Sequence, residues 1–436
     1  MKVKLVVLAV SLVSITGWSQ KIDKTKIDAY FDTLANNNKF MGSVAISHNK
    51  EVVYTKTVGF ADIDKKIKAN ENTTYRIASI SKTFTTVLIF KAIEENRLRL
   101  DQTLSHFFPT IENSDRITIE QILYHRSGLP DILWNDESDW TQPKTKQEMI
   151  EIISDGVSDF EPDSQTNYIN TGFFLLSYVL EKIYEKSYSE ILEEKIIKPV
   201  GLRNTYLGEN INVNKNESNP YSHYGWIKQP VIDWTVLLGA AGIVSNAVDL
   251  TLFSNALFNG NLISMESLQQ METLKDDYGM GLFEMSFSNR VGFWIEGGLH
   301  GFRSWLIYFP DSNISIALTA NGININFNDV ITTVLKATFN EPFEIPEFPN
   351  YHVTDEALDK YLGIYSSEQL PIKMFITKVN NTLYRQLTGR DAVPMQGIAK
   401  DKFEIAGYGA ILEFFPSEKT VVFYQHGNTY NFTRDE

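Results

Sequence analysis

The sequence predicts an α+β fold in which helices flank an antiparallel sheet, with a small all-β, barrel-like domain at the C-terminal end. Short apolar runs that alternate with polar residues occur at 42–59 and again at 279–319. Residues 96–270 between them are mainly helical and loop-forming in character, and alternating runs return beyond residue 350. Strands on both sides of a helical region favour one sheet beside a mainly helical subdomain.

The individual elements follow from the same periodicities. Residues 21–38 have the apolar spacing of an amphipathic helix, and residues 42–47 and 51–59 form a predicted β-hairpin. A strongly apolar helix is expected from about Ser79 to Glu95. The other predicted elements of this region are strands at 279–287, 290–296, 304–309 and 313–319 and a closing helix at 327–339.

A proline-rich segment separates two predicted domains. Residues 341–350 contain three prolines, which favour an extended linker between a large domain at 20–340 and a second domain at 351–436. The second domain has short alternating runs separated by turn residues at Asn380-Asn381, Gly389-Arg390 and Gly427-Asn428. It carries no catalytic pattern, so we expect inert packing, with ligand binding or shaping of a cleft as alternatives.

The first nineteen residues have the composition of a secretory signal peptide. Lys2 and Lys4 form a basic start, an apolar run extends from Leu5 to Ile15, and the small residue Ser19 follows. This run is too short to span a bilayer, and no other stretch is long and apolar enough. We therefore expect a soluble, exported protein, periplasmic or extracellular. The absence of cysteine excludes disulfides and a lipid-modified cysteine anchor.

The net charge and the composition indicate which classes of molecule the protein can bind. The formal net charge is −14, which argues against nucleic acid and anionic membranes as partners. The seven histidines are scattered without His-x-His or His-Glu-x-x-His spacing, so we expect neither a metal site nor another cofactor. The expected partner is a small-molecule or short-peptide substrate, and the sequence makes no prediction about protein partners.

A serine and a lysine three residues apart are the main candidates for catalysis. Ser79 and Lys82 stand at the start of the predicted apolar helix, where residues i and i+3 share a face. A serine becomes a useful nucleophile when a base takes its proton, and a buried lysine with a lowered pKa can be that base. Ser81 points to another side of the helix and is expected to be dispensable.

A second Ser-x-x-Lys, formed by Ser47 and Lys50, needs a different interpretation. It lies between the two runs of the predicted hairpin. We expect a solvated turn there and no catalytic role.

A single Tyr-x-Asn, at Tyr168 and Asn170, marks the entrance of another apolar helix. A tyrosine beside a lysine ammonium has its phenolate favoured, which suits proton transfer. The Asn170 amide can both donate and accept, so it can orient a substrate or the lysine. The alternative is that Asn170 only caps the helix while Tyr168 packs beside it.

Together these motifs resemble the serine β-lactamase and penicillin-binding protein superfamily, in particular the Tyr-x-Asn branch with class C β-lactamases, D-aminopeptidases and esterases. The C-terminal module resembles the lipocalin-like barrel often appended to this family. Further stretches match the family in the family's order. They are Leu123–Asp131, Pro199–Thr205, Ala240–Leu250 and Tyr278–Leu282. The resemblance implies a β-lactamase/transpeptidase-like fold with Ser79, Lys82 and Tyr168 as catalytic residues and Asn170 orienting the substrate.

The family's third motif, a lysine or histidine followed by a small residue and glycine, is incomplete here. Ile295-Glu296-Gly297 takes its place without a gap, and Glu296-Gly297-Gly298 with a one-residue deletion. Neither carries the cation that helps to hold a substrate carboxylate. His300 is expected to be a loop residue, with replacement of the cation as the alternative.

The glycines of this stretch still suit substrate binding. A strand edge without side chains lets a substrate backbone approach closely, so Glu296, Gly297 and Gly298 are expected to line or orient the substrate. The backbone N–H of Ser79, with that of Gly298 or Leu299, would form the oxyanion hole.

The sequence favours a serine hydrolase that forms an acyl-enzyme on amide or ester bonds of D-amino-acid peptides, peptidoglycan fragments or acyl esters. The alternatives are a β-lactamase and a non-catalytic penicillin-binding or muropeptide sensor. Because the usual cation is absent and Glu296 adds a negative charge nearby, carboxylate-bearing substrates are expected to bind poorly. An inward-turned Arg303 would reverse that expectation.

Overall fold

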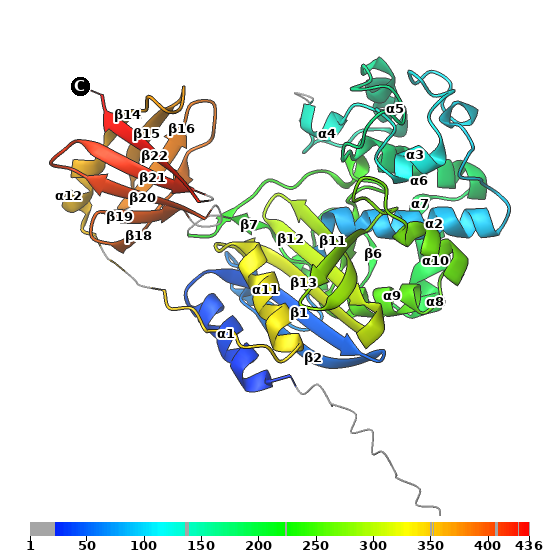
Figure 1. The fold of residues 1–436 in the computed structure, drawn as a ribbon, viewed down its shortest axis with the longest axis horizontal. Helices are drawn as coiled ribbons and strands as arrows, with labels where there is room; N and C mark the ends of the chain where they lie inside the picture. Colours follow the sequence, from blue (N-terminus) through cyan, green and yellow to red (C-terminus); the bar gives the residue numbers. More distant parts are fainter. Residues whose placement is uncertain are drawn as a thin grey trace, which may run out of the picture.

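The computed structural model describes residues 22–135, 139–222, 225–348, 351, 353–405, 409–425 and 427–435. The signal peptide expected at 1–19 lies outside these residues. In the described part of the chain, a large sheet with helices on both faces adjoins a helical region, and a separate all-β unit follows (Figure 1). None of the helices within these ranges is long and apolar enough to cross a membrane.

The main sheet is antiparallel and joins both ends of the large region. Strand β1 lies between β13 and β2, so the N-terminal hairpin completes a sheet built from the later strands. The order is β10 (Phe283–Phe287), β11 (Arg290–Leu299), β12 (Phe302–Phe309), β13 (Ile314–Ile323), β1 (Phe40–His48) and β2 (Glu51–Val58). Two short strands extend it beside β13, namely β7 (Tyr221–Ser222) and β8 (Ile227–Lys228).

Each face of the sheet packs against different helices. One face buries apolar side chains against α1 (Lys24–Asn36) and α11 (Phe327–Thr338). The other face packs against α9 (Ala247–Phe258), beside α2 (Ser81–Glu94), and shares its core with the helical region. Burial of these two apolar layers is the main stabilising contribution to the α+β fold that the periodicities predict.

The helical region surrounds α2, which is apolar on nearly all sides and buried along its first ten residues. Its helices are α3 (Ile119–Leu123), α4 (Ile132–Asn135), α5 (Lys146–Asp155), α6 (Thr171–Tyr184), α7 (Tyr188–Leu192), α8 (Lys198–Val200) and α10 (Met265–Glu272). Small strand groups connect it to the sheet. They are β3 (Phe60–Asp62) with β4 (Ile67–Lys68), and β5 (Tyr75–Arg76), β9 (Ile243–Ser245) and β6 (Tyr206–Leu207).

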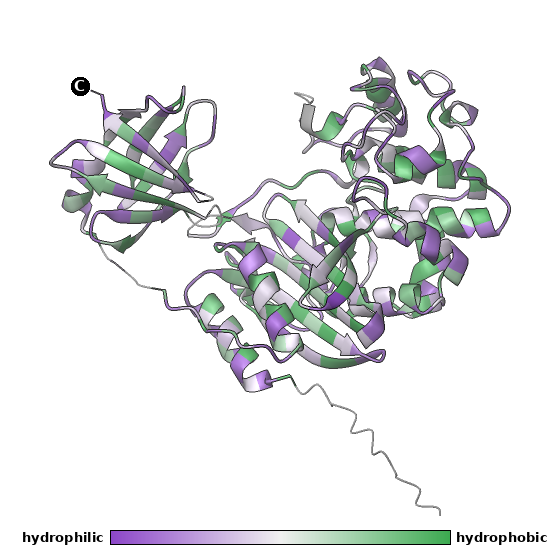
Figure 2. Cartoon of the chain, in the orientation of Figure 1, coloured by the Kyte–Doolittle hydropathy of each residue, from purple (hydrophilic) through white to green (hydrophobic). Residues whose placement is uncertain are grey.

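The C-terminal strands form a nearly closed β-barrel. The order is β17-β16-β15-β14-β22-β21-β20-β19-β18, and β17 and β18 at the two edges are separated by Met395 alone. Figure 2 shows bands of opposite hydropathy along these strands, as expected when alternate residues face a packed interior. The bounds are β14 (Gly363–Ser366), β15 (Lys373–Val379), β16 (Thr382–Leu387), β17 (Val393–Pro394), β18 (Gln396–Ala399), β19 (Lys402–Ile405), β20 (Ala410–Phe415), β21 (Thr420–Gln425) and β22 (Asn428–Arg434), preceded by α12 (Asp355–Leu358).

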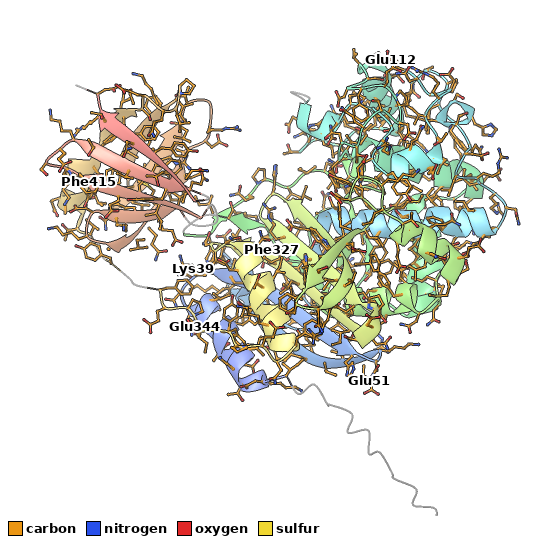
Figure 3. All side chains as sticks on the ribbon, viewed as in Figure 1. Lys39, Glu51, Glu112, Phe327, Glu344 and Phe415 are labelled. Atoms are coloured by element: carbon orange, nitrogen blue, oxygen red, sulfur yellow. The ribbon has the colours of Figure 1, made fainter. Side chains whose placement is uncertain are left out.

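The proline-rich segment and Lys39 tie this barrel to the rest of the chain. Phe343 is buried against the face of the sheet that α1 covers, so the first residues of the segment pack on the large domain. Lys39, labelled in Figure 3, is 2% exposed, and its amine contacts Glu404 at 2.8 Å and Gln396 at 3.2 Å. A buried ammonium needs such acceptors, which favours one docking position of the barrel.

Two local expectations differ from the structure. Ser47 is fully buried at the end of β1 and accepts a hydrogen bond from Asn255, so only Lys50 of that pair belongs to an exposed turn. The predicted strand at 279–287 begins only at Phe283. Gly281 has φ +73° and lies so close to Thr86 that a Cβ would be 2.4 Å from its hydroxyl, which requires a turn there.

The segment that carries Ser79 packs directly on strand β11. Ser79 belongs to η1 (Ala78–Ile80), which leads into α2. A Cβ on Gly297 would lie 2.2 Å from the Ile77 carbonyl oxygen and 3.1 Å from Ala78 Cβ. Ser304 on β12 donates to the same carbonyl at 2.7 Å. The absence of a side chain at Gly297 therefore sets how close the turn comes to the sheet.

Replacement of this glycine should disturb the packing, whereas its neighbour should tolerate the same change. We expect Gly297→Ala to destabilise the protein by about 1–3 kcal/mol, because backbone atoms must move apart. Gly298→Ala meets only the flexible end of Arg303 and should stay within about 0.5 kcal/mol of the parent. Urea unfolding of both variants measures the difference. Equal destabilisation of the two would contradict this account of the packing.

Candidate active site

Ser79 is presented by a strained turn. The preceding residue, Ala78, has φ +46°, in the left-handed region that non-glycine residues seldom occupy. The Ser79 side chain is partly exposed, whereas Ser81 is buried and accepts the N–H of Ile243 at 3.1 Å. The two hydroxyls therefore have separate surroundings. Ser81 does have a structural partner, which the sequence did not predict.

The Lys82 amine is fully buried and has three polar neighbours. Nζ lies 3.1 Å from Ser79 Oγ, 2.8 Å from Asn170 Oδ1 and 3.0 Å from the Ala240 carbonyl oxygen. Two of these neighbours can only accept hydrogen bonds, whereas the serine hydroxyl can also donate one. A neutral amine, with two N–H groups and one lone pair, can satisfy all three contacts at once.

The electrostatics favour that neutral form near pH 7. Burial lowers the pKa of Lys82 to about 7, and the nearby Asp131 carboxylate opposes this shift. Removal of an ammonium group from water is costly, and the carbonyl dipoles compensate only partly for that cost. Lys82 therefore meets the requirement for a base that the Ser-x-x-Lys spacing predicted.

Asn170 connects Lys82 to a buried carboxylate. It precedes α6 at the cap position, but its side chain makes no capping hydrogen bond. Its amide instead bridges the two groups, accepting from Lys82 through Oδ1 and donating to Asp131 Oδ2 at 3.0 Å. The alternative that Asn170 serves only as a helix cap is therefore wrong.

Asp131 is a member of this group that the sequence reasoning did not select. It lies at the end of the Leu123–Asp131 stretch, is 8% exposed, and burial raises the pKa of its carboxyl. Its Oδ1 atom is buried without a hydrogen-bond partner among the described residues. A carboxylate at this place is costly unless it interacts with a charge, and the nearby Lys82 supplies that charge in its protonated form.

Tyr168 contacts Ser79 from the loop that precedes α6. Its hydroxyl hydrogen-bonds to Ser79, and its ring stacks on His125 with 4.5 Å between centroids. Burial raises the pKa of Tyr168, and the charges of Asp131 and Glu296 add to this effect. The expectation that its phenolate is favoured is therefore wrong, because desolvation outweighs the influence of the lysine. Tyr168 keeps its proton.

His125 acts as the platform for this tyrosine. It is 2% exposed, and burial lowers its pKa to about 3, so the imidazole stays neutral. Its Nδ1 accepts the backbone N–H of Ile169 at 3.2 Å, which fixes the loop one residue beyond Tyr168. Histidine was not among the residues selected from sequence, although it lies in a stretch that matches the family.

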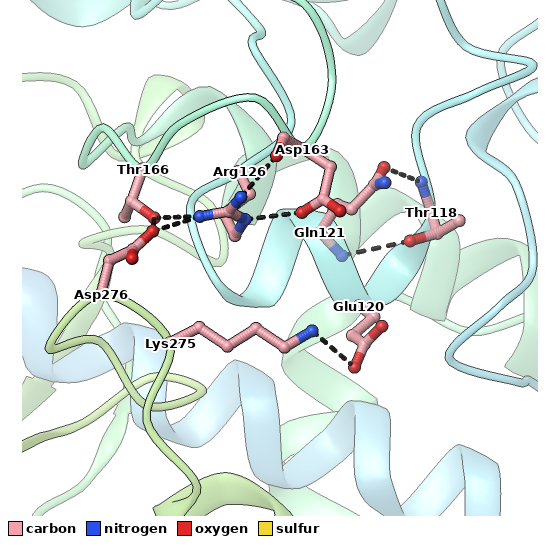
Figure 4. Close-up of polar contacts among 8 residues, drawn as sticks. All are labelled: Thr118, Glu120, Gln121, Arg126, Asp163, Thr166, Lys275 and Asp276. Carbon is pink, nitrogen blue, oxygen red and sulfur yellow. Dashed lines mark hydrogen bonds and ion pairs between the residues drawn. The ribbon is translucent and has the colours of Figure 1, made fainter.

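A polar network holds the loops around Tyr168 (Figure 4). Arg126 donates to Asp163 at 2.6 Å and to Thr166 at 3.0 Å, and it also pairs with Asp276. Thr166 donates to Asp276 at 2.9 Å. One guanidinium therefore joins the loop before Tyr168 to the loop before Tyr278, and this restricts the position of Tyr168.

The third-motif residues alternate between the two faces of β11. Ile295, Gly297 and Leu299 are buried on the side of the Ser79 turn, and Ile295 is only 4% exposed. Glu296 and Gly298 are exposed on the other face. Neither register places a cation at the motif. His300 is in the two-residue turn between β11 and β12, as the loop interpretation predicts.

The hairpin register distinguishes the two candidate N–H groups. Leu299 and Phe302 flank the two-residue turn, and such a flanking pair exchanges both backbone hydrogen bonds. Gly298 and Arg303 are then the next, non-hydrogen-bonded pair. The N–H of Gly298 points to the open edge of β11, because β10 pairs with β11 only as far as Trp294. Gly298 is therefore the better candidate of the two.

The chain is similar in sequence to known proteins over this whole region. A family model described as Beta-lactamase matches residues 27–337. "Penicillin-binding protein 4*" of Bacillus subtilis (strain 168) is 24% identical over 444 residues, which cover 92% of this chain and 96% of that protein. "Protein flp" of Staphylococcus aureus (strain MRSA252) is 25% identical over 299 residues, which cover 64% of this chain and 59% of that protein.

Solved structures share the fold. An octameric penicillin-binding protein homologue from Pyrococcus abyssi has a TM-score of 0.64 at 21% identity, covering 94% of this chain and 100% of that one. A D-amino acid amidase from Ochrobactrum anthropi SV3 has a TM-score of 0.64 at 23% identity, covering 72% and 99%. The α+β fold with its appended barrel is thus that of the β-lactamase/transpeptidase-like superfamily. Because the family model matches well over half of its residues, the chain belongs to the Beta-lactamase family.

Proposed function

We propose that the protein is an exported serine hydrolase that cleaves amide or ester bonds through an acyl-enzyme on Ser79. The observation that carries the proposal is the environment of Lys82. Its amine is buried 3.1 Å from the Ser79 hydroxyl, with two carbonyl oxygens to orient it. Such a base can take a serine proton near pH 7 without any further charged group.

Acylation would begin with attack of Ser79 Oγ on the substrate carbonyl carbon while its proton moves to Lys82. The resulting oxyanion would be held by the N–H groups of Ser79 and Gly298. Tyr168 would give its proton to the leaving nitrogen or oxygen. The Lys82 ammonium, which also contacts Ser79, would then restore the Tyr168 hydroxyl. Because its pKa is raised, Tyr168 carries its proton at rest and has one to give to the leaving group.

Deacylation would use the same groups in reverse. Water enters, loses its proton to the neutral Lys82 amine and attacks the ester carbonyl, and the Lys82 ammonium then returns that proton to Ser79 Oγ as the acid product leaves. Asp131 and Asn170 would act through Lys82 as positioning residues. The negative charge of Asp131 favours the ammonium form that Lys82 adopts in each step.

Two structural neighbours support an amidase or peptidase in preference to a β-lactamase. One structural neighbour is a D-amino acid amidase crystallised with D-phenylalanine. Another is a D-stereospecific amidohydrolase from Streptomyces sp.. The third motif lacks the cation that would hold the carboxylate of a β-lactam, and a buried isoleucine occupies one candidate position. We therefore propose D-amino-acid amides, short peptides or acyl esters as the substrate class.

The nucleophile can be tested with two substrates. We expect Ser79→Ala to abolish hydrolysis of an activated ester, measured by release of its chromophore. Ser81→Ala should keep the chemistry but lose about 1–3 kcal/mol of stability, because the Ile243 N–H loses its acceptor. Turnover of the ester alone supports the proposal, whereas turnover of a fluorescent penicillin as well indicates a β-lactamase. Stable labelling by the penicillin without turnover indicates a sensor.

The proton-transfer pair can be tested by a double-mutant cycle. Lys82→Ala and Tyr168→Phe should each lower kcat by about 10²- to 10⁴-fold. The double variant should lose much less than the product of the two effects, because both side chains contact Ser79 and act together. Multiplicative losses would show that the two residues act independently.

The pH dependence of kcat/KM should follow the protonation of the Lys82 amine. The neutral amine is the active form, so activity should fall as the pH drops through its pKa of about 7. Asp131 raises the pKa of Lys82, so Asp131→Asn should shift this acidic limb to lower pH. His125 does not titrate in that range, since its pKa is about 3. A limb that stays in place in Asp131→Asn would contradict the coupling.

The proposal that the protein is exported rests on the basic start and the apolar run within residues 1–19. We expect the mature protein to begin at Gln20 and to accumulate outside the cytoplasm. Mass spectrometry of the native protein from cell fractions tests this, and an intact N-terminus in the cytoplasmic fraction would contradict it.

A further inference from the structure

Two opposite charges flank Gly298 on the exposed face of the β11–β12 hairpin. Glu296 stands two residues before Gly298 on β11, and Arg303 is its cross-strand neighbour on β12. Both side chains are exposed. The guanidinium of Arg303 lies across Gly298, since a Cβ there would be 2.6 Å from Nη1. A cation is thus present beside the third motif, although neither register of the motif contains one.

Both charges keep capacity to bind another molecule. Arg303 has five N–H donors, of which its hydrogen bond to the Phe302 carbonyl at 3.2 Å uses one. Partial burial raises the pKa of the Glu296 carboxyl. The positive charge of Arg303 opposes this shift but is the smaller effect. The Glu296 charge also raises the pKa of Tyr168, so it acts electrostatically on the hydroxyl beside Ser79.

The spacing along the strand defines what could bridge the two charges. The Cα atoms of residues two apart on a strand, here Glu296 and Gly298, are separated by roughly 6.6 Å, and the Arg303 guanidinium lies over the second of them. The terminal amine and carboxylate of an extended dipeptide are about 7 Å apart, by the same measure of two residues. A molecule of this length along the open edge of β11 would also bring its carbonyl near the Gly298 N–H.

We propose that Glu296 and Arg303 form a subsite for zwitterionic substrates, namely short unblocked peptides whose ammonium group pairs with Glu296 and whose carboxylate pairs with Arg303. This subsite rests on the proposed function of Ser79. It also revises the expectation that carboxylates are disfavoured, because the guanidinium beside Gly298 offsets the charge of Glu296. A substrate with one charged end gains one of the two attractions. A zwitterion gains both attractions.

The test uses one dipeptide with each end free or blocked. D-Phe-Gly, N-acetyl-D-Phe-Gly, D-Phe-glycinamide and N-acetyl-D-Phe-glycinamide are compared by kcat/KM at pH 7.5. Each free end should raise kcat/KM by roughly 10-fold, the usual order for a hydrogen bond to a charged group. Glu296→Gln should remove the preference for the free amine only. Arg303→Gln should remove the preference for the free carboxylate only.

A matched control is Glu284→Gln, which removes an exposed carboxylate from neighbouring strand β10. It should leave both preferences unchanged. Equal kcat/KM for all four peptides in the parent protein would overturn the subsite. So would a preference for the free amine that persists in Glu296→Gln.

Binding to the Ser79→Ala protein separates this subsite from the catalytic proposal. Calorimetry should show tighter binding of D-Phe-Gly than of its doubly blocked form. If that difference is seen but no peptide or ester is hydrolysed by the parent protein, the subsite stands and the proposed function fails. Hydrolysis that depends on Ser79 but shows no charge preference overturns the subsite alone.

Discussion

The burial of one lysine amine is the constraint on which the rest of the site depends. A buried amine, whether neutral or protonated, needs hydrogen-bond partners from the residues around it. For Lys82 they come from three segments, the turn at Ser79, the start of α6 at Asn170 and the loop at Ala240. These segments are far apart in sequence, so the packing of α2, α6 and the loop that precedes β9 must be correct before the base exists.

The sheet provides the second constraint, because it sets the distance between the nucleophile and the strand edge. Ala78 adopts a strained conformation, and Gly297 lets its backbone approach β11 without a clash. The Ser304 hydroxyl holds Ile77 at the same point. A strained backbone conformation persists only where the surrounding contacts hold it in place. The contacts of Gly297 and Ser304 hold the turn before Ser79 in this way. The N–H of Gly298, the residue after Gly297, points to the edge of β11 that β10 leaves unpaired.

Much of the site could be predicted from sequence because its main pairs are local. Ser79 and Lys82 are one helical turn apart, and Tyr168 and Asn170 share a helix entrance, so each pair is local. The match of further stretches to a known family then singled these pairs out. The ladder of strands followed from alternation, and the barrel from turn residues such as Asn380 and Asn381, which have positive φ in the structure. Local patterns of this kind do not show how deeply an individual polar group is buried.

What could not be predicted depends on long-range packing. The pKa of Tyr168 rises because the fold buries its hydroxyl, whereas the sequence shows only the neighbouring lysine. Asp131 meets Asn170 across 39 positions. Gly281 forms a turn because Thr86, nearly 200 positions earlier in the sequence, is close to it.

The most direct test of the central claim is to locate and time the covalent labelling of the nucleophile. A fluorophosphonate probe should modify a single residue in the tryptic peptide Ile77–Lys82, and fragmentation should place the adduct on Ser79 instead of Ser81. The rate of labelling should rise with pH with a midpoint near the pKa of Lys82, about 7. An adduct elsewhere, or a rate independent of pH between about 5 and 9, would contradict activation of Ser79 by a neutral Lys82.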